Sequence, residues 1–184
     1  MALRKSSAEH WDEADFRAIF QQHYARIVNI LVRLLGDRAH ADDVANDAFW
    51  RLYGQPALQT DGNVGGWLYR TAMNLGIDAL RMSARRRQHE GTAGRIAQEH
   101  IQDGPLDDLL REETRRRVRR VLSLVKPAQA QLLILRSAGL SYKEIADALE
   151  MKATSVGTML NRAEEEFRNR YVDFIRTRRN YDLS

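Results

Sequence analysis

The chain has 184 residues and no cysteine, which excludes disulfide bonds, a thiolate nucleophile and any metal site built on cysteine. Proline is scarce: Pro56, Pro105 and Pro127 stand where a helix should begin or a loop should run. No stretch alternates apolar and polar residues with the β-branched enrichment of a strand, and no hairpin signal occurs. These absences predict an all-α protein.

Long apolar runs are also missing. No run approaches the roughly 20 residues that a helix needs to span a bilayer. The first ten residues lack the apolar segment of a secretory signal peptide. We therefore expect a cytoplasmic protein with no membrane insertion.

Patterns typical of enzymes and metal sites are absent as well. The five histidines are scattered and none lies four residues from another: His10, His23, His40, His89 and His100. No glycine-rich phosphate loop or nucleophile elbow occurs. We expect neither catalysis, nor a metal, nor a cofactor.

The positive charge is local. The formal net charge is only +4, with 29 basic and 25 acidic residues. Arginines nevertheless gather in Arg85–Arg87, Arg115–Arg117 and Arg119–Arg120. The position of these arginines matters more than the net charge of the chain, because local clusters of basic side chains attract phosphates. Since consecutive arginines point all around a helix, the second and third runs are better interpreted as a solvated face with some phosphate contact.

Apolar periodicity predicts a first domain over residues 12–89. Its three helices are expected at 12–35, 39–53 and 64–89, and three helices of this length can close a small bundle. Gly36 should end the first helix, since glycine adopts the left-handed conformation at no steric cost.

A polar stretch at 90–105 holds three glycines and no sustained apolar period, which predicts a flexible linker. A second helical domain is expected at 106–175. Ser141 and Glu144 have the spacing of a capping box, and Thr154 is expected to cap the last helix. Two short helices around a tight turn match a helix-turn-helix. Flexible tails are expected at 1–11 and 176–184.

The predicted helix 64–89 carries two stripes. Leu68, Ala72, Leu75, Ala79 and Met82 form an apolar face. A second stripe, about 100° further round, contains Trp67, Arg70, Asn74, Asp78, Arg81 and Arg85, and Arg86 and Arg87 follow it. Arginines bind phosphates, amides read base edges and aromatic rings stack on unpaired bases, so this stripe is a candidate nucleic-acid reader. It is equally well interpreted as the solvated face of a bundle helix.

Two further surfaces have open interpretations. Acidic and amide side chains line one side of the predicted helix 39–53: Asp42, Asp43, Asn46 and Asp47, with Arg51 beyond them. They form either a solvated face favoured by the helix dipole or a docking site for a basic partner. The helix-turn-helix would direct Ser155, Thr158, Asn161 and Arg162 toward a major groove, although many helical hairpins never touch DNA.

The order of these pieces resembles a bacterial RNA polymerase sigma factor of the extracytoplasmic-function (ECF) type. Residues 41–53 (ADDVANDAFWRLY) resemble the family's polymerase-binding helix. Residues 67–70 (WLYR), with Asn74, Asp78 and the arginines after them, resemble the segment that opens and reads the minus-ten element. Residues 140–146 (LSYKEIA) and 155–158 (SVGT) resemble the helix-turn-helix that reads the minus-thirty-five element.

This resemblance implies a division of labour. Asp42, Asp43, Asn46, Asp47 and Arg51 would dock the clamp helices of core RNA polymerase. Trp67, Arg70, Asn74, Asp78, Arg81, Arg85, Arg86 and Arg87 would hold an extruded base and the phosphates of melted promoter DNA. Lys143, Thr154, Ser155, Thr158, Asn161 and Arg162 would serve the helix-turn-helix in a domain that also contacts the polymerase flap. An anti-sigma factor is an expected further partner.

Two features depart from the family's pattern. The helix-turn-helix turn reads Leu149-Glu150-Met151 where the family usually has glycine, so this turn either differs or is strained by about a kcal/mol. The recognition helix continues into Glu164, Glu165 and Glu166, whose carboxylates repel phosphates.

Two other classes of protein compete with this interpretation. A stand-alone helix-turn-helix regulator would need a dimer and a palindromic site. A protein-interaction module with incidental arginines would have no affinity for DNA.

Overall fold

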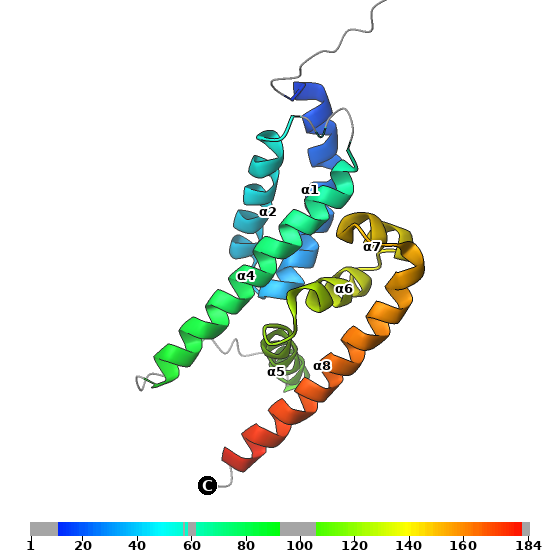
Figure 1. The fold of residues 1–184 in the computed structure, drawn as a ribbon. Helices are drawn as coiled ribbons and strands as arrows, with labels where there is room; N and C mark the ends of the chain where they lie inside the picture. The colour runs from blue at the N-terminus through cyan, green and yellow to red at the C-terminus, as the bar shows by residue number, and fades with distance from the viewer. Residues whose placement is uncertain (1–10, 57, 59–61, 93–105, 182–184) are drawn as a thin grey trace, which may run out of the picture.

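The computed structural model describes residues 11–56, 58, 62–92 and 106–181 (Figure 1). The helices are α1 (Glu13–Leu35), α2 (Arg38–Tyr53), α4 (Val64–Thr92), α5 (Leu106–Leu122), α6 (Pro127–Ser137), α7 (Tyr142–Leu149) and α8 (Ala153–Tyr181). Within the described ranges the chain forms no strand, which confirms the all-α prediction. Most of the predicted linker, at 93–105, lies outside the described residues.

The N-terminal bundle consists of α1, α2 and α4. The Asp12 carboxylate caps α1 by accepting hydrogen bonds from the backbone N–H groups of Ala14 and Asp15. Gly36 ends the helix at φ 79°, as its sequence position predicted. Asp37 then caps α2 by accepting a hydrogen bond from the backbone of His40. These caps turn the chain back so that α2 lies beside α1.

A continuous core holds the three N-terminal helices together. Its largest fully buried side chains come from all three: Ile27, Leu31, Leu52, Leu68, Met73 and Ile77. α4 approaches α1 most closely at Gly76, where a Cβ atom would lie 2.7 Å from Cδ2 of Leu31. A methyl group there would overlap that side chain, so the buried leucine would have to shift to admit it.

The C-terminal bundle consists of α5 to α8. Gly139, at φ 82°, lies in the turn after α6. The predicted capping box of α7 is confirmed: Ser141 accepts from the backbone of Glu144, whose carboxylate accepts from the backbone of Ser141. Two short turns thus place α6, α7 and the start of α8 against one another, as a helix-turn-helix requires.

Three local expectations differ from the structure. α8 begins at Ala153, so Thr154 lies inside its first turn rather than at the cap. α8 also continues to Tyr181, past the predicted end of the domain at 175. Met82 is 60% exposed, whereas Tyr69 and Met73 are buried. The predicted apolar face of α4 was right for Leu68 and Ala72 but incomplete, because partners on two sides of the helix bury more positions than a single stripe contains.

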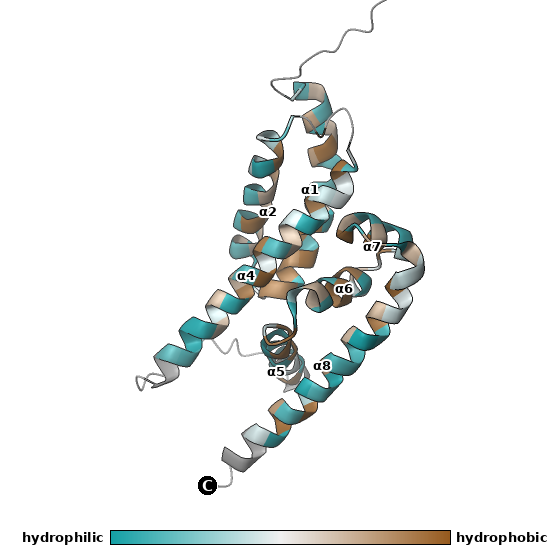
Figure 2. Cartoon of the chain, in the orientation of Figure 1, coloured by the Kyte–Doolittle hydropathy of each residue, from teal (hydrophilic) through white to brown (hydrophobic). Residues whose placement is uncertain are grey.

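The two bundles pack directly against each other. One hydrophobic cluster runs from Trp11 in the N-terminal bundle to Leu160 in the C-terminal bundle. α4 contacts α1 and α2 in its own bundle and α6 and α7 in the other (Figure 1). Its C-terminal half is mostly hydrophilic and extends beyond this packing (Figure 2). None of the helices in the described ranges is long and apolar enough to cross a membrane.

Gly76→Ala should lower the free energy of unfolding by about 1–3 kcal/mol, because the new methyl group overpacks the contact between α4 and α1. Gly157→Ala is the matched control. Its Cβ would meet Tyr142 at an ordinary 3.5 Å, so it should raise stability by roughly 0.5–1 kcal/mol. Urea unfolding measures both; equal effects of the two substitutions would contradict the close approach at Gly76.

Candidate nucleic-acid and protein interfaces

The acidic surface predicted on the second helix exists as an exposed face of α2. Asp43, Asn46, Asp47 and Arg51 are all exposed and recur at helical spacing. Asp42 differs, because its carboxylate accepts from Tyr24 Oη at 3.2 Å and from Arg38 Nε at 2.9 Å. The exposed acidic groups available to a partner are therefore Asp43 and Asp47.

An exposed aromatic pair adjoins this acidic face. Trp50 is 76% exposed and its ring stacks on that of Tyr53, with centroids 5.9 Å apart and planes at 18°. Trp50 lies one helical turn after Asp47. Exposed tryptophan is typical of protein interfaces, and sequence reasoning missed this role. The signal was available: Phe49 and Leu52 belong to the buried register of α2, and Trp50 does not.

The polar stripe of α4 divides into two parts. Asp78, Arg85, Arg86 and Arg87 are exposed. The other part contacts the C-terminal bundle, although Asn74 within it is itself exposed. Asn74 accepts a hydrogen bond from the Gln131 side chain, and Arg81 donates to the backbone carbonyl of Val125 at 2.8 Å. Trp67 is half-buried against the core.

Glu150, in the turn between α7 and α8, makes a further contact between the C-terminal bundle and α4. Its backbone lies in the left-handed region, at φ 53° and ψ 46°, and it is the only non-glycine residue with positive φ in the described ranges. This confirms the expected strain, which costs about 1–2 kcal/mol. A carboxylate oxygen of Glu150 lies 2.5 Å from a guanidinium nitrogen of Arg70 on α4. The hydrogen bond from Arg70 and its positive charge lower the pKa of Glu150.

Further polar contacts continue this boundary, which we call the seam: the surface where α4, α1 and the loop before α4 meet the C-terminal bundle. Asn63 uses both ends of its amide there. Its oxygen caps α4 through the backbone N–H of Gly66, at 2.8 Å, and its nitrogen donates to the carbonyl of Asp147 at 3.2 Å. A Cβ atom on Gly66 would lie 2.7 Å from that same carbonyl. Glycine here lets α7 approach α4.

The seam also joins α1 to α7. Arg26 lies 3.2 Å from the Glu144 carboxylate and 5.7 Å from the centroid of the Tyr69 ring. Hydrogen bonds from Ser141 lower the pKa of Glu144, and Arg26 adds to this effect. Burial lowers the pKa of His23, and the neighbouring Arg26 charge acts in the same direction.

The helix-turn-helix presents its predicted residues outward. Lys143, Thr154, Thr158, Asn161 and Arg162 are exposed, and Ser155 is half-buried. The carboxylates that follow do not all share this surface. Glu164 and Glu165 are exposed, whereas Glu166 pairs with Arg170 at 2.6 Å.

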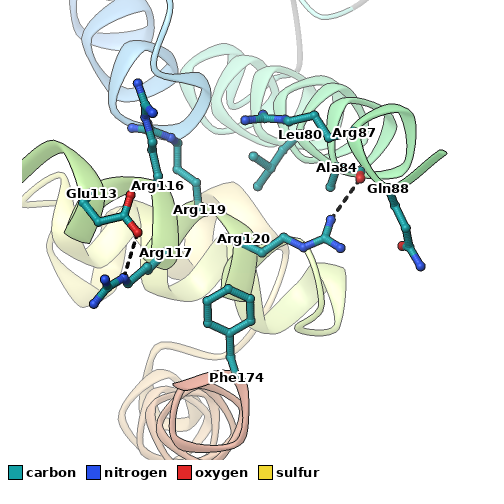
Figure 3. A pocket seen from close by; sticks show the side chains of 10 residues that line it. All are labelled: Leu80, Ala84, Arg87, Gln88, Glu113, Arg116, Arg117, Arg119, Arg120 and Phe174. Carbon is teal, nitrogen blue, oxygen red and sulfur yellow. Dashed lines mark hydrogen bonds and ion pairs between the residues drawn. The ribbon is translucent and has the colours of Figure 1, made fainter. Parts of the chain in front are cut away.

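Arginines from both bundles line a hollow between α4, α5 and α8 (Figure 3). α5 contributes Arg116, Arg117, Arg119 and Arg120. Arg120 spans the hollow and donates to the carbonyl of Ala84 at 2.9 Å. The α5 run therefore serves bundle contact as well as solvation. No cluster of three or more histidine and carboxylate side chains that could hold a metal ion occurs among the described residues.

Two family models match the two bundles. The model for sigma-70 region 2 matches residues 19–86, and that for sigma-70 region 4 matches residues 115–167. The first match contains the acidic face and the α4 stripe; the second contains the helix-turn-helix. Together they cover more than half of the chain. The chain belongs to the sigma-70 family.

Its similarity to other members extends along most of its length and indicates the ECF type. It is 28% identical to the ECF sigma factor SigK of Mycolicibacterium vanbaalenii, over 91% of this chain and 85% of that protein. It is 26% identical to the ECF sigma-E factor of Escherichia coli, over 90% of this chain and 91% of the other. The expected family is thereby confirmed.

A solved sigma factor shares the fold. The sigma factor RpoE of Bartonella quintana, crystallised with the anti-sigma factor NepR, matches with a TM-score of 0.50 at 18% identity. The match covers 85% of this chain and 96% of the other. At this identity the likeness supports the helical architecture alone.

For this sigma-70 family member, Trp50→Ala should leave the free energy of unfolding within about 0.5 kcal/mol of wild type, because the ring is mostly exposed. The same change should weaken binding to core RNA polymerase, since the ring adjoins the acidic face. Phe49→Ala, one residue earlier and buried, should instead destabilise the protein by about 3–5 kcal/mol. Thermal unfolding and a polymerase pull-down separate the two; loss of stability in Trp50→Ala would contradict an interface role.

Proposed function

We propose that this chain is an alternative sigma factor that binds core RNA polymerase and directs promoter-specific transcription initiation by recognising and melting promoter DNA. The observation that carries the proposal is the succession of sigma-70 region 2 and region 4 matches along one chain, each on its own helical bundle. The exposed chemistry of the two bundles supports it.

Polymerase binding is assigned to α2. Asp43, Asn46, Asp47 and Arg51 form an exposed polar face with two free carboxylates. This face suits a basic surface on a partner helix, because complementary charge fixes register and speeds association. The clamp helices of core RNA polymerase are the proposed partner, and Trp50 adds apolar contact area at the edge.

Promoter melting is assigned to α4. Asn74 and Trp67 would hold a base extruded from the duplex, since flipping costs a few kcal/mol that stacking and hydrogen bonds must offset. Arg81 and the exposed run Arg85–Arg87 would hold phosphates on either side. Each phosphate contact releases counterions, so binding should weaken as salt is raised.

The C-terminal bundle is assigned to the minus-thirty-five element and the polymerase flap. Thr158, Asn161 and Arg162 supply hydroxyl, amide and guanidinium groups on the exposed side of α8. Glu164 and Glu165 would limit this contact by repelling phosphates. An anti-sigma factor is a further proposed partner, as for the Bartonella quintana protein.

Run-off transcription tests the proposed function directly. The purified chain, added to core RNA polymerase with a library of promoters, should yield transcripts that core enzyme alone does not make. Absence of every such transcript would overturn the proposal. A stable dimer that binds palindromic duplex DNA without polymerase would instead indicate a stand-alone regulator.

Asp47→Arg should weaken binding to core polymerase by about tenfold, because it places a positive charge in the proposed contact with a basic helix. Asp173→Arg makes the same charge change on an exposed site of α8 and should leave affinity unchanged. Surface plasmon resonance measures both. Equal affinities of the two variants would remove α2 from the docking surface.

A further inference from the structure

The seam includes side chains that the proposed function also assigns to promoter DNA. Arg70, Asn74 and Arg81 are members of the α4 stripe, and each has a partner in the C-terminal bundle. Asn74 is exposed, but its side-chain oxygen already accepts from Gln131, so a base would compete with Gln131 for that oxygen. Bundle contact and promoter reading therefore compete for these three side chains.

We propose that Glu150 is a latch that holds the free protein closed: its carboxylate pairs with Arg70 and keeps the C-terminal bundle over the promoter-reading side of α4. This inference rests on the proposed function for the identity of the blocked ligand, which is single-stranded promoter DNA. The latch itself is a contact between two parts of the chain and can be measured without DNA or polymerase.

The backbone at Glu150 supports a role for its side chain. The turn between α7 and α8 requires a left-handed residue, and glycine would adopt that conformation without strain. Glu150 is strained there, yet its carboxylate reaches across to α4. A strained residue whose side chain contacts another part of the chain points to a function for that side chain.

The Arg70–Glu150 pair acts selectively on the closed form. Arg70 is 26% exposed in this arrangement, and Glu150 is the partner that the structure gives it. In an open form the same guanidinium would be solvated and would need no counter-charge. Removal of the carboxylate therefore penalises closure alone, which shifts the population toward the open form.

One exposed ion pair is a weak contact, so the latch works together with the rest of the seam. Gln131 is 8% exposed and bonded to Asn74 beneath it. Arg120 and Arg81 reach carbonyl groups across the boundary in opposite directions. In this proposal only the open form binds DNA, so the apparent affinity for DNA is proportional to the fraction of molecules that are open. A change in that fraction changes DNA binding by the same factor.

Spin labels measure the closure of the free protein. The chain has no cysteine, so cysteines introduced at the exposed Gln21 of α1 and Asn169 of α8 are its only labelling sites. Double electron–electron resonance should give one main distance for wild type. Glu150→Gly and Glu150→Gln should each add a population at a longer distance, and Glu165→Gln should not. Glu165 is exposed on α8, so its variant matches the charge change of Glu150→Gln away from the seam.

Fluorescence anisotropy measures the consequence for DNA. The free Glu150 variants should bind a labelled single-stranded minus-ten oligonucleotide about two- to fivefold more tightly than wild type. Gln131→Ala, combined with Glu150→Gly, should increase the effect. Asp173→Asn should stay at the wild-type affinity; Asp173 is exposed near the C-terminal end of α8, so this variant controls for the general effect of removing a negative charge.

The outcomes separate the latch from the proposed function. Identical distance distributions for wild type and Glu150→Gly would overturn the latch, whatever the protein does in transcription. A changed distribution without any transcript from core polymerase would retain the latch and overturn the proposed function.

Discussion

The burial of α4 on two sides, by helices of both bundles, is the constraint on which the rest of the structure depends. Apolar residues occupy more of its circumference than one neighbouring bundle can cover: Leu68, Tyr69, Ala72, Met73, Ile77, Leu80 and Ala84 are all buried. α1 and α2 cover one side, and α6 and α7 cover the other. Since exposed apolar surface is unfavourable in water, the free chain gains stability by folding its second bundle onto the first.

This constraint explains which parts of the fold were predictable from sequence. Helix ends depend on local chemistry, so Gly36 and the Ser141–Glu144 capping box were predicted where they occur. The seam was not predictable, because it joins residues far apart in the chain, such as Arg70 and Glu150. Periodicity shows which side chains share a face of a helix but does not show what covers that face.

The candidate interfaces were also only partly predictable from the sequence. The acidic residues of α2 were predicted as one surface, and all but Asp42 are exposed there. Trp50 was not singled out, although its position outside the buried register of α2 marks it as exposed. The α4 stripe was predicted as a unit, yet the structure divides it into an exposed arginine end and a part that contacts the second bundle through Arg70, Asn74 and Arg81. Only the packing of the second bundle could make that division.

The two parts of the α4 stripe would therefore contact DNA at different stages of binding. Arg85 and Arg86 are exposed in the closed form and can meet phosphates before the bundles separate. Such contacts are long-ranged and independent of sequence, so they suit first encounter with DNA. Arg70 and the Asn74 oxygen lose their partners in the second bundle only when the seam opens, and in the proposed function Asn74 supplies the amide that reads a base. Under the proposed function and the proposed latch, attraction to DNA therefore precedes recognition, and the Arg70–Glu150 contact separates the two steps.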